Sequence, residues 1–280
     1  MKYHIVNAFS RNNIGGNPAA VVVNQNLSGE EKQEAAKQIG FSETAFINND
    51  DNRLFIEFFT PEKPISYCGH ATIASVNILY QQQLVTDGHY ILHTNENPIP
   101  VEITNGKVYM QQQYPTFHKV DLDEIAALLN TTKENIESVI ITRNGVGYLL
   151  IELKDENILY HLKPDEKLVY NYSEKHDLIG IYPYTKVDGI ILSRMFAPFY
   201  GIKEENATGM AAGLLGGWIH YQSGEKTKEL FIEQGHSYFM KEKGYLHVMI
   251  EVGGGNKKIL VGGEAVIRET VSDLTASEIN

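Results

Sequence analysis

A glutamate stands near the start of an apolar run, Ser42-Glu43-Thr44-Ala45-Phe46-Ile47. A carboxylate at an apolar site is costly unless it is protonated or paired, and burial raises its pKa. A carboxyl group tuned in this way can both give and take a proton near neutral pH. The run therefore predicts Glu43 as a candidate acid/base group; a solvent-facing glutamate at a strand end is the alternative.

Two segments carry small residues where an apolar helix is expected to begin, Gly69-His70-Ala71 and Gly209-Met210-Ala211. Small side chains leave backbone N–H groups uncovered, and the helix dipole adds roughly half a positive charge there. Such a helix start can bind a carboxylate or a phosphate without a basic side chain. We expect the two backbones to hold a small anionic substrate, although tight helix–sheet packing would also explain the small residues.

Three more side chains near these helix starts could take part in chemistry. His70 could donate a hydrogen bond or relay a proton, or it could be a structural histidine. Cys68 next to His70 suggests a nucleophilic pair, but positions i and i+2 do not face each other on a helix, so we expect no working dyad. Glu205 follows Glu204 ahead of the second helix, where it could cap the helix or contribute a carboxylate to a cleft.

The composition argues against several classes of partner and site. The 280 residues include 24 Lys and Arg against 35 Asp and Glu, a formal net charge of −11. This excess of acid repels nucleic-acid backbones and anionic membranes, so we expect neither as a partner. The single cysteine excludes an intrachain disulfide and a Cys-rich zinc site, and His89 and His93 lie too far apart on an extended strand to share a metal. We therefore expect no metal site, and the sequence contains no dinucleotide or P-loop fingerprint.

The first residues, MKYHIVNAFSRNN, lack the long apolar stretch of a signal peptide. No apolar run approaches the ~18 residues that a membrane-spanning helix requires. We therefore expect a cytoplasmic protein.

Short strands and a few well-capped helices must position these candidate residues. Strands are predicted over 3–8, 19–23, 43–47, 54–59, 89–93, 99–103 and 107–111, with a hairpin turn at Asn105-Gly106. Ser28 and Glu31 form a capping box for a helix that ends before Gly40. A second helix is expected over 69–83.

Tyr114-Pro115 ends this first series of strands and helices, and a second series begins after it. It comprises a helix that starts at Asp121, strands over 138–142 and 147–152, a helix over 165–176, strands over 189–194 and 246–252, and a final strand over 258–262, followed by a polar tail over 274–280. This pattern predicts an α+β fold with a largely antiparallel sheet. We place one lobe over 1–115, completed by the C-terminal strand 262–280, and the other over 116–261.

The two helix starts also belong to an internal sequence repeat. Each is preceded by a Phe-x-Pro sequence, Phe59-Thr60-Pro61 in one half and Phe196-Ala197-Pro198 in the other, and each opens an apolar helix. This repeat predicts two related lobes, each with a central helix that points toward a shared cleft.

Short motifs in a characteristic order make the chain similar to a known family. They lie at residues 7–9, 16–22, 42–46, 59–61, 68–72, 194–198, 204–209, 234–235 and 261–266. The sequence resembles the PhzF-like isomerases of phenazine biosynthesis, which are relatives of diaminopimelate epimerase. The resemblance implies two pseudo-symmetric lobes, each a mostly antiparallel barrel-like sheet around a central helix. It also implies an active site between the lobes, a homodimer, and an isomerase that needs no cofactor.

The resemblance also assigns roles to residues. Glu43 falls on the glutamate that moves a proton between carbons of the substrate ring, and His70 on the histidine of a Gly-His-Ala motif. We expect the catalytic residues to be Glu43, His70 and Glu205. We expect the substrate-binding residues to be Asn17, Gly69, Ala71, Gly209, Met210 and Ala211.

The chain departs from the family pattern at three places. Glu205 stands where an aspartate is usual, Met210 stands where a serine is usual, and residues 240–244 replace a Gly-Arg-Pro-Ser stretch. A single cysteine excludes racemisation by two opposed thiols, which leaves a carboxyl acid/base as the proton carrier. Two alternatives stay open: a small-carboxylate binding protein without catalysis, and a one-cysteine racemase or epimerase that uses Cys68.

Overall fold

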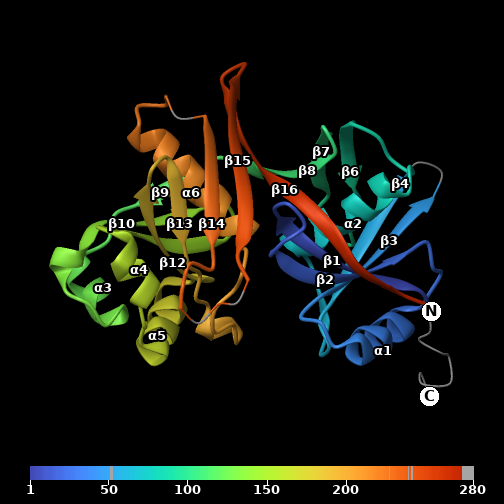
Figure 1. Cartoon of the computed structure of the whole chain (residues 1–280), viewed down its shortest axis with the longest axis horizontal. Coiled ribbons are helices and arrows are strands. Elements are labelled where there is room, and N and C mark those ends of the chain that lie inside the picture. The colour runs from blue at the N-terminus through green and yellow to red at the C-terminus, as the bar shows by residue number, and fades with distance from the viewer. Residues whose placement is uncertain (51–52, 227, 239, 241, 273–280) are drawn as a thin grey trace. The chain divides into compact units, whose positions relative to one another are not determined.

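The computed structural model describes residues 1–50, 53–226, 228–238, 240 and 242–272. The predicted tail over 274–280 and residue 241 of the 240–244 segment lie outside the described residues. The chain divides into two compact units, one made of Met1–Gln111 and the segment that starts at Gly262, the other of Gln112–Val261 (Figure 1). Strands β8 and β16 each contribute residues to both units.

The first unit is a closed, barrel-like sheet. Its strands follow the order β5-β4-β3-β2-β1-β16, and β8, β7 and β6 continue from β16. Backbone hydrogen bonds of His93 with Leu54 and Ile56 join the end of β6 to β4 and close the ring. The elements are β1 (Tyr3–Ser10), β2 (Asn17–Val23), α1 (Gly29–Ile39), β3 (Thr44–Asp50), β4 (Arg53–Phe59), β5 (Pro64–Ile65), α2 (Gly69–Gln81), β6 (Gly88–Leu92), β7 (Ile99–Thr104), β8 (Lys107–Gln113) and the second half of β16 (Asn256–Val271).

Helix α2 is the core of this unit. Residues 70–79 are all buried, and the helix packs against β1, β2 and β3. A helix that is apolar on every side is stable only inside a protein, which explains why the sheet wraps around it. Helix α1 lies outside the ring against β3 and β4, with the predicted capping box of Ser28 and Glu31 and with Gly40 in the left-handed conformation at its end.

The second unit repeats this plan. Its sheet has the order β16-β15-β14-β13-β12-β11-β10-β9, and the buried helix α6 packs against β10, β11, β14 and β15. Apolar residues of α3, α4 and α5 form a second core with strands β10 to β13. The elements are β9 (Thr116–His118), α3 (Leu122–Leu128), η1 (Lys133–Asn135), β10 (Ile136–Arg143), β11 (Gly147–Leu153), α4 (Glu156–His161), α5 (Glu166–His176), β12 (Gly180–Val187), β13 (Ile190–Ser193), η2 (Pro198–Tyr200), α6 (Gly209–Gln222), β14 (Glu229–Gln234) and β15 (Gly244–Gly253).

The predicted α+β class, with a sheet around a central helix in each unit, is confirmed. The sheets are more mixed than expected, because β2–β3, β11–β12 and β13–β14 are parallel pairs. The predicted strands omit β12 and β14, and the strands predicted over 258–262 and 262–280 are one continuous strand, β16, which ends at Val271. Its second half is partly exposed and pairs with β1.

Candidate active site

The first unit brings Glu43 and His70 together. Glu43 directly precedes β3, and His70 is the second residue of α2. Glu43 Oε2 lies 3.1 Å from His70 Nε2, with side-chain exposures of 19% and 6%. The carboxylate oxygen is buried, and its distance from the ring nitrogen is that of an ion pair. The structure thus places two predicted catalytic side chains in contact at the start of the core helix.

The expected rise in the pKa of Glu43 is wrong in sign. Burial raises the pKa of this carboxyl, but the adjacent imidazole of His70 and a hydrogen bond from Ser42 lower it, and the net shift is downward. Burial lowers the pKa of His70, the contacts with Cys68 and Glu43 raise it, and the net shift is upward. The opposite directions of the two shifts favour a carboxylate beside an imidazolium. An ionised Glu43 can accept a proton, and its lowered pKa makes it a weaker base than an unpaired glutamate.

Asn17, the first residue of β2, completes this cluster. Its Nδ2 atom lies 3.4 Å from His70 Nδ1, and the residue is buried. A carboxamide can donate to a neutral imidazole or, turned over, accept from an imidazolium. Asn17 can therefore hold the ring of His70 in either protonation state. Its backbone is held by a tight turn, since Gly16 has φ +94° and a Cβ there would lie 2.5 Å from the Ala8 carbonyl oxygen.

Cys68 also contacts His70, contrary to expectation. Its Sγ lies 3.6 Å from Nδ1 and 3.9 Å from Nε2. The helical spacing rule does not apply, because Cys68 is the N-cap residue with extended backbone angles, φ −147° and ψ 113°. Burial raises the pKa of this thiol, charge and hydrogen bonding from His70 lower it, and the net shift is upward. The thiol is thus protonated and unsuited to act as a base.

Glu43, Cys68 and His70 offer oxygen, sulfur and nitrogen atoms that lie within 4.8 Å of one another, as a metal site would require. In this structure the same three side chains contact one another, since His70 Nε2 lies 3.1 Å from Glu43 Oε2 and 3.9 Å from Cys68 Sγ.

Both helix starts lack a side-chain cap. Cys68 at α2 and Thr208 at α6 make no capping hydrogen bond from their side chains, and neither first turn contains an acidic residue. Gly69 is half-buried and Ala71 is buried; Gly209 and Ala211 are buried and Met210 is partly exposed. An uncapped first turn that is free of acid suits an anion. Because α2 and α6 belong to different units, the shared cleft stays a prediction.

Glu205 lies in the second unit, in a turn held by buried side chains. Its Oε2 accepts a hydrogen bond from the hydroxyl of Thr208, and its backbone N–H donates to the Met195 carbonyl at 3.2 Å. Gln234, which is fully buried, bonds both Glu205 and Thr208. Gln234 and Thr208 are not among the site residues predicted from the sequence. Their presence in family-like motifs was the one available signal, because a lone glutamine at a strand end indicates no chemistry.

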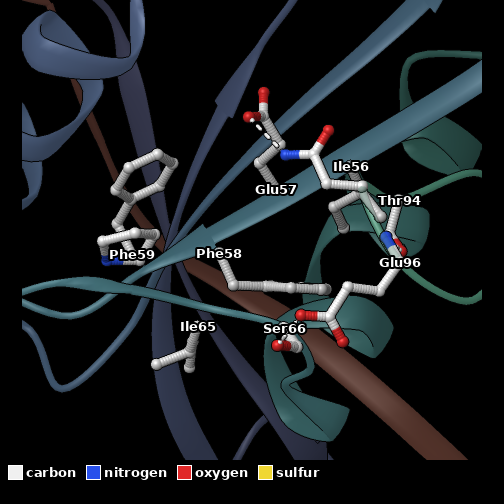
Figure 2. Close-up of a pocket in the computed structure, with 10 residues that line it drawn as sticks. Ile56, Glu57, Phe58, Phe59, Ile65, Ser66, Thr94 and Glu96 are labelled. Atoms are coloured by element: carbon white, nitrogen blue, oxygen red, sulfur yellow. Dashed lines mark hydrogen bonds between the residues drawn. The ribbon is translucent and has the colours of Figure 1, made fainter.

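Two cavities are lined by other residues of the two units. Figure 2 shows one of about 250 Å³ in the first unit, lined by β4, β5 and residues 94–96, with Glu96 held by the Ser66 hydroxyl. The other, of about 640 Å³, lies in the second unit beside Arg194, whose guanidinium binds both oxygens of Glu204. Glu43, His70 and Glu205 line neither cavity.

Within the described part of the chain, the helices are too short or too polar to span a bilayer.

Comparison with known proteins identifies the family. The family model for phenazine biosynthesis-like proteins, PhzC-PhzF, matches residues 6–270. The chain is 30% identical to the trans-2,3-dihydro-3-hydroxyanthranilate isomerase of Pseudomonas aeruginosa, over 76% of this chain and 78% of that protein. It is 28% identical to an uncharacterized isomerase of Bacillus subtilis, over 94% of this chain and 95% of that protein.

Solved structures agree on the fold. A PhzF-family phenazine biosynthesis protein of Bacillus anthracis superposes with a TM-score of 0.86 at 22% identity, covering 98% of this chain and 99% of that one. A hydroxyproline epimerase of Agrobacterium vitis superposes with a TM-score of 0.61 at 9% identity, covering 97% and 91%, which shows a shared fold alone. The resemblance seen in the sequence and the expected enzyme class are confirmed: the chain belongs to the PhzC-PhzF family of phenazine biosynthesis-like proteins, and its named relatives are isomerases.

Proposed function

We propose that this protein is an isomerase that moves a proton within a small carboxylate substrate, without a cofactor, and that Glu43 carries the proton. The observation that supports this most is the buried contact of Glu43 with His70, together with the opposite shifts of their pKa values. A carboxylate kept ionised beside an imidazolium can remove a proton from carbon and then return it, which is general acid–base catalysis.

The proposed reaction conserves all atoms and electrons. Glu43 takes a proton from one carbon of the substrate, and the electron pair of the broken C–H bond enters the neighbouring double-bond system. The double bond shifts, and the same proton returns from Glu43 to another carbon of the substrate. When Glu43 becomes neutral, His70 loses its ionic partner inside the protein, so the imidazolium favours return of the proton to the substrate and restoration of the pair.

The substrate class follows from the helix starts. The uncapped first turns of α2 and α6 suit a carboxylate, with Gly69, Ala71, Gly209, Met210 and Ala211 contributing backbone groups. Asn17 would orient His70, and Glu205 would orient a polar group of the substrate. The name of the Pseudomonas relative suggests a cyclic amino- or hydroxycarboxylate as the first compound to test. Met210 and Glu205 in place of Ser and Asp favour a substrate that differs from it.

Replacement of Glu43 by Gln tests the proposal. The assay incubates the protein in D₂O with trans-2,3-dihydro-3-hydroxyanthranilate and a panel of small cyclic carboxylates, and NMR detects product and deuterium on carbon. We expect Glu43→Gln to lower turnover by at least ~100-fold, the usual contribution of a general acid–base group. The matched control is Glu62→Gln, an exposed glutamate of the same unit. Turnover within about threefold of the unmodified protein would rule out Glu43 as the proton carrier.

The same assay separates the two alternatives. A small-carboxylate binding protein would show ligand shifts in NMR without conversion. A one-cysteine racemase would place deuterium on an sp³ α-carbon and lose activity in Cys68→Ala, but the upward shift of the Cys68 pKa argues against a thiolate base.

We also propose that the protein is a homodimer, as its resemblance to the family implies, and that it is cytoplasmic, as expected from its first residues. Light scattering coupled to size-exclusion chromatography would give the mass, which for a dimer is twice the 31.5 kDa of one chain.

A further inference from the structure

Gln234 is a fully buried amide at the end of β14 whose orientation is determined by backbone groups. Its Nε2 donates to the Glu205 carbonyl oxygen at 2.8 Å, and its Oε1 accepts from the Thr208 backbone N–H at 2.9 Å. A carbonyl can only accept and an N–H can only donate, so the amide cannot be turned over without losing both bonds. The direction of every other hydrogen bond of Gln234 follows from this.

The fixed amide sets the direction of the Thr208 hydroxyl. Gln234 Nε2 uses its second hydrogen to donate to Thr208 Oγ1 at 2.9 Å. The Thr208 hydroxyl proton then points at Oε2 of Glu205. That oxygen is an acceptor only when the carboxyl group carries no proton there. The amide of Gln234, acting through Thr208, thus stabilises the ionised form of Glu205.

The same chain of bonds extends away from Glu205 into the core. Tyr182 donates to Gln234 Oε1 at 2.9 Å, and Ser193 donates to the Tyr182 oxygen at 3.0 Å. Tyr182 and Ser193 are both fully buried. Burial raises the pKa of Tyr182, so its phenol keeps the proton that it donates. The bonds therefore run in one direction, from Ser193 through Tyr182 and Gln234 to Thr208 at the N-cap position of α6, and end on the carboxylate of Glu205.

We propose that Gln234 is a positioning residue of the isomerase site, which acts through Thr208 to keep Glu205 ionised and aimed from the turn before α6. This inference deepens the proposed function, because it rests on Glu205 as a polar group of that site. The neighbouring Glu204 cannot replace it, since both Glu204 oxygens bind the buried guanidinium of Arg194.

The test measures the titration of Glu205 itself by ¹³C NMR of protein labelled at the glutamate δ-carbon, with the signal assigned by its loss in Glu205→Gln. Thr208→Val keeps the side-chain shape but removes the hydroxyl. We expect it to raise the titration midpoint of Glu205 by about one pH unit, the effect of one lost hydrogen bond to a charged acceptor. Thr208→Ser should retain the midpoint of the unmodified protein.

Gln234→Glu adds a second, independent perturbation. A carboxylate at position 234 can no longer donate, so the Thr208 hydroxyl should turn toward it and leave Glu205. The midpoint should then rise more than in Thr208→Val. The matched control is Gln112→Met, which removes another buried amide that also holds the start of α6, through a 3.0 Å bond to the Gly209 carbonyl. This control should leave the Glu205 midpoint unchanged.

Midpoints within about 0.3 pH units of the unmodified protein in both Thr208→Val and Gln234→Glu would overturn the proposal. An equal shift in Gln112→Met would also overturn it, since the effect would then come from general disturbance of α6. The titration is measured without substrate. Its result therefore stands even if Glu43→Gln shows that the proposed isomerisation is wrong.

Discussion

The contact of Glu43 with His70 predicts a stability that depends on pH in a specific way. The perturbation is Glu43→Gln, which keeps the size of the side chain and removes its charge. The two facing atoms are 3.1 Å apart, and the side chains are 19% and 6% exposed. The variant leaves a buried imidazole without its anion, so we expect the folded state to lose stability.

The size of this loss can be estimated from the geometry. At 3.1 Å, two unit charges attract each other by about 5 kcal/mol for an effective dielectric constant of about 20. Desolvation of a nearly buried imidazolium and a mostly buried carboxylate cancels more than half of this attraction. We therefore expect Glu43→Gln to lower the free energy of unfolding by about 2 kcal/mol where both groups are charged.

The pH range follows from the directions of the two shifts. The pKa of Glu43 is lowered, so its contribution is present above the ordinary value of 4.5 and is lost as pH falls through the lower folded value. The pKa of His70 is raised, so its contribution is present below the ordinary value of 6.5 and is lost as pH rises through the higher folded value. The difference between the two proteins should be largest between pH 4.5 and 6.5.

Urea unfolding from pH 3.5 to 9, followed by circular dichroism, measures this difference. Glu62→Gln is the control and should change stability by less than about 0.5 kcal/mol at every pH. A difference between Glu43→Gln and the unmodified protein that is flat with pH, or that grows toward pH 9, would refute the assignment of a carboxylate–imidazolium pair.

Three further results are expected. The thiol of Cys68 is 6% exposed and its pKa is raised, so a disulfide reagent at pH 8 should react with it on the order of 100-fold more slowly in the native protein than in urea; equal rates would contradict its burial. Arg194→Met should lower the free energy of unfolding by about 3 to 5 kcal/mol, because it leaves the buried carboxylate of Glu204 unpaired, and a loss below about 1 kcal/mol in urea unfolding would count against this. Gly16→Ala should lower the free energy of unfolding by about 3 kcal/mol. Gly145 has a similar φ of +99° but open space around it, so Gly145→Ala should lower the free energy of unfolding by about 1 kcal/mol; equal losses would show that the close approach at Gly16 is unimportant.

Local sequence chemistry was sufficient for many elements of the fold. The capping box of Ser28 and Glu31, the stop at Gly40 and the Asn105-Gly106 turn depend on side chains close in sequence, and the structure contains all three. The second half of β16 is different. A strand was predicted there from the sequence, but its partner β1 lies far away in the chain, so the pairing that satisfies its backbone groups depends on the tertiary structure.

The candidate site divides in the same way. The residue types of Glu43 and His70, in their motifs, were enough to select them as a chemical pair, because few side chains transfer protons near neutral pH. The direction of the Glu43 pKa shift could not be predicted from the sequence, because it depends on the distance to an imidazole on another element. The contact of Cys68 with His70 depends on one extended N-cap residue, and the role inferred for Gln234 depends on bonds to residues far from it in the chain. Sequence determines which groups are available; tertiary packing determines which of them touch, and electrostatic effects depend on those distances.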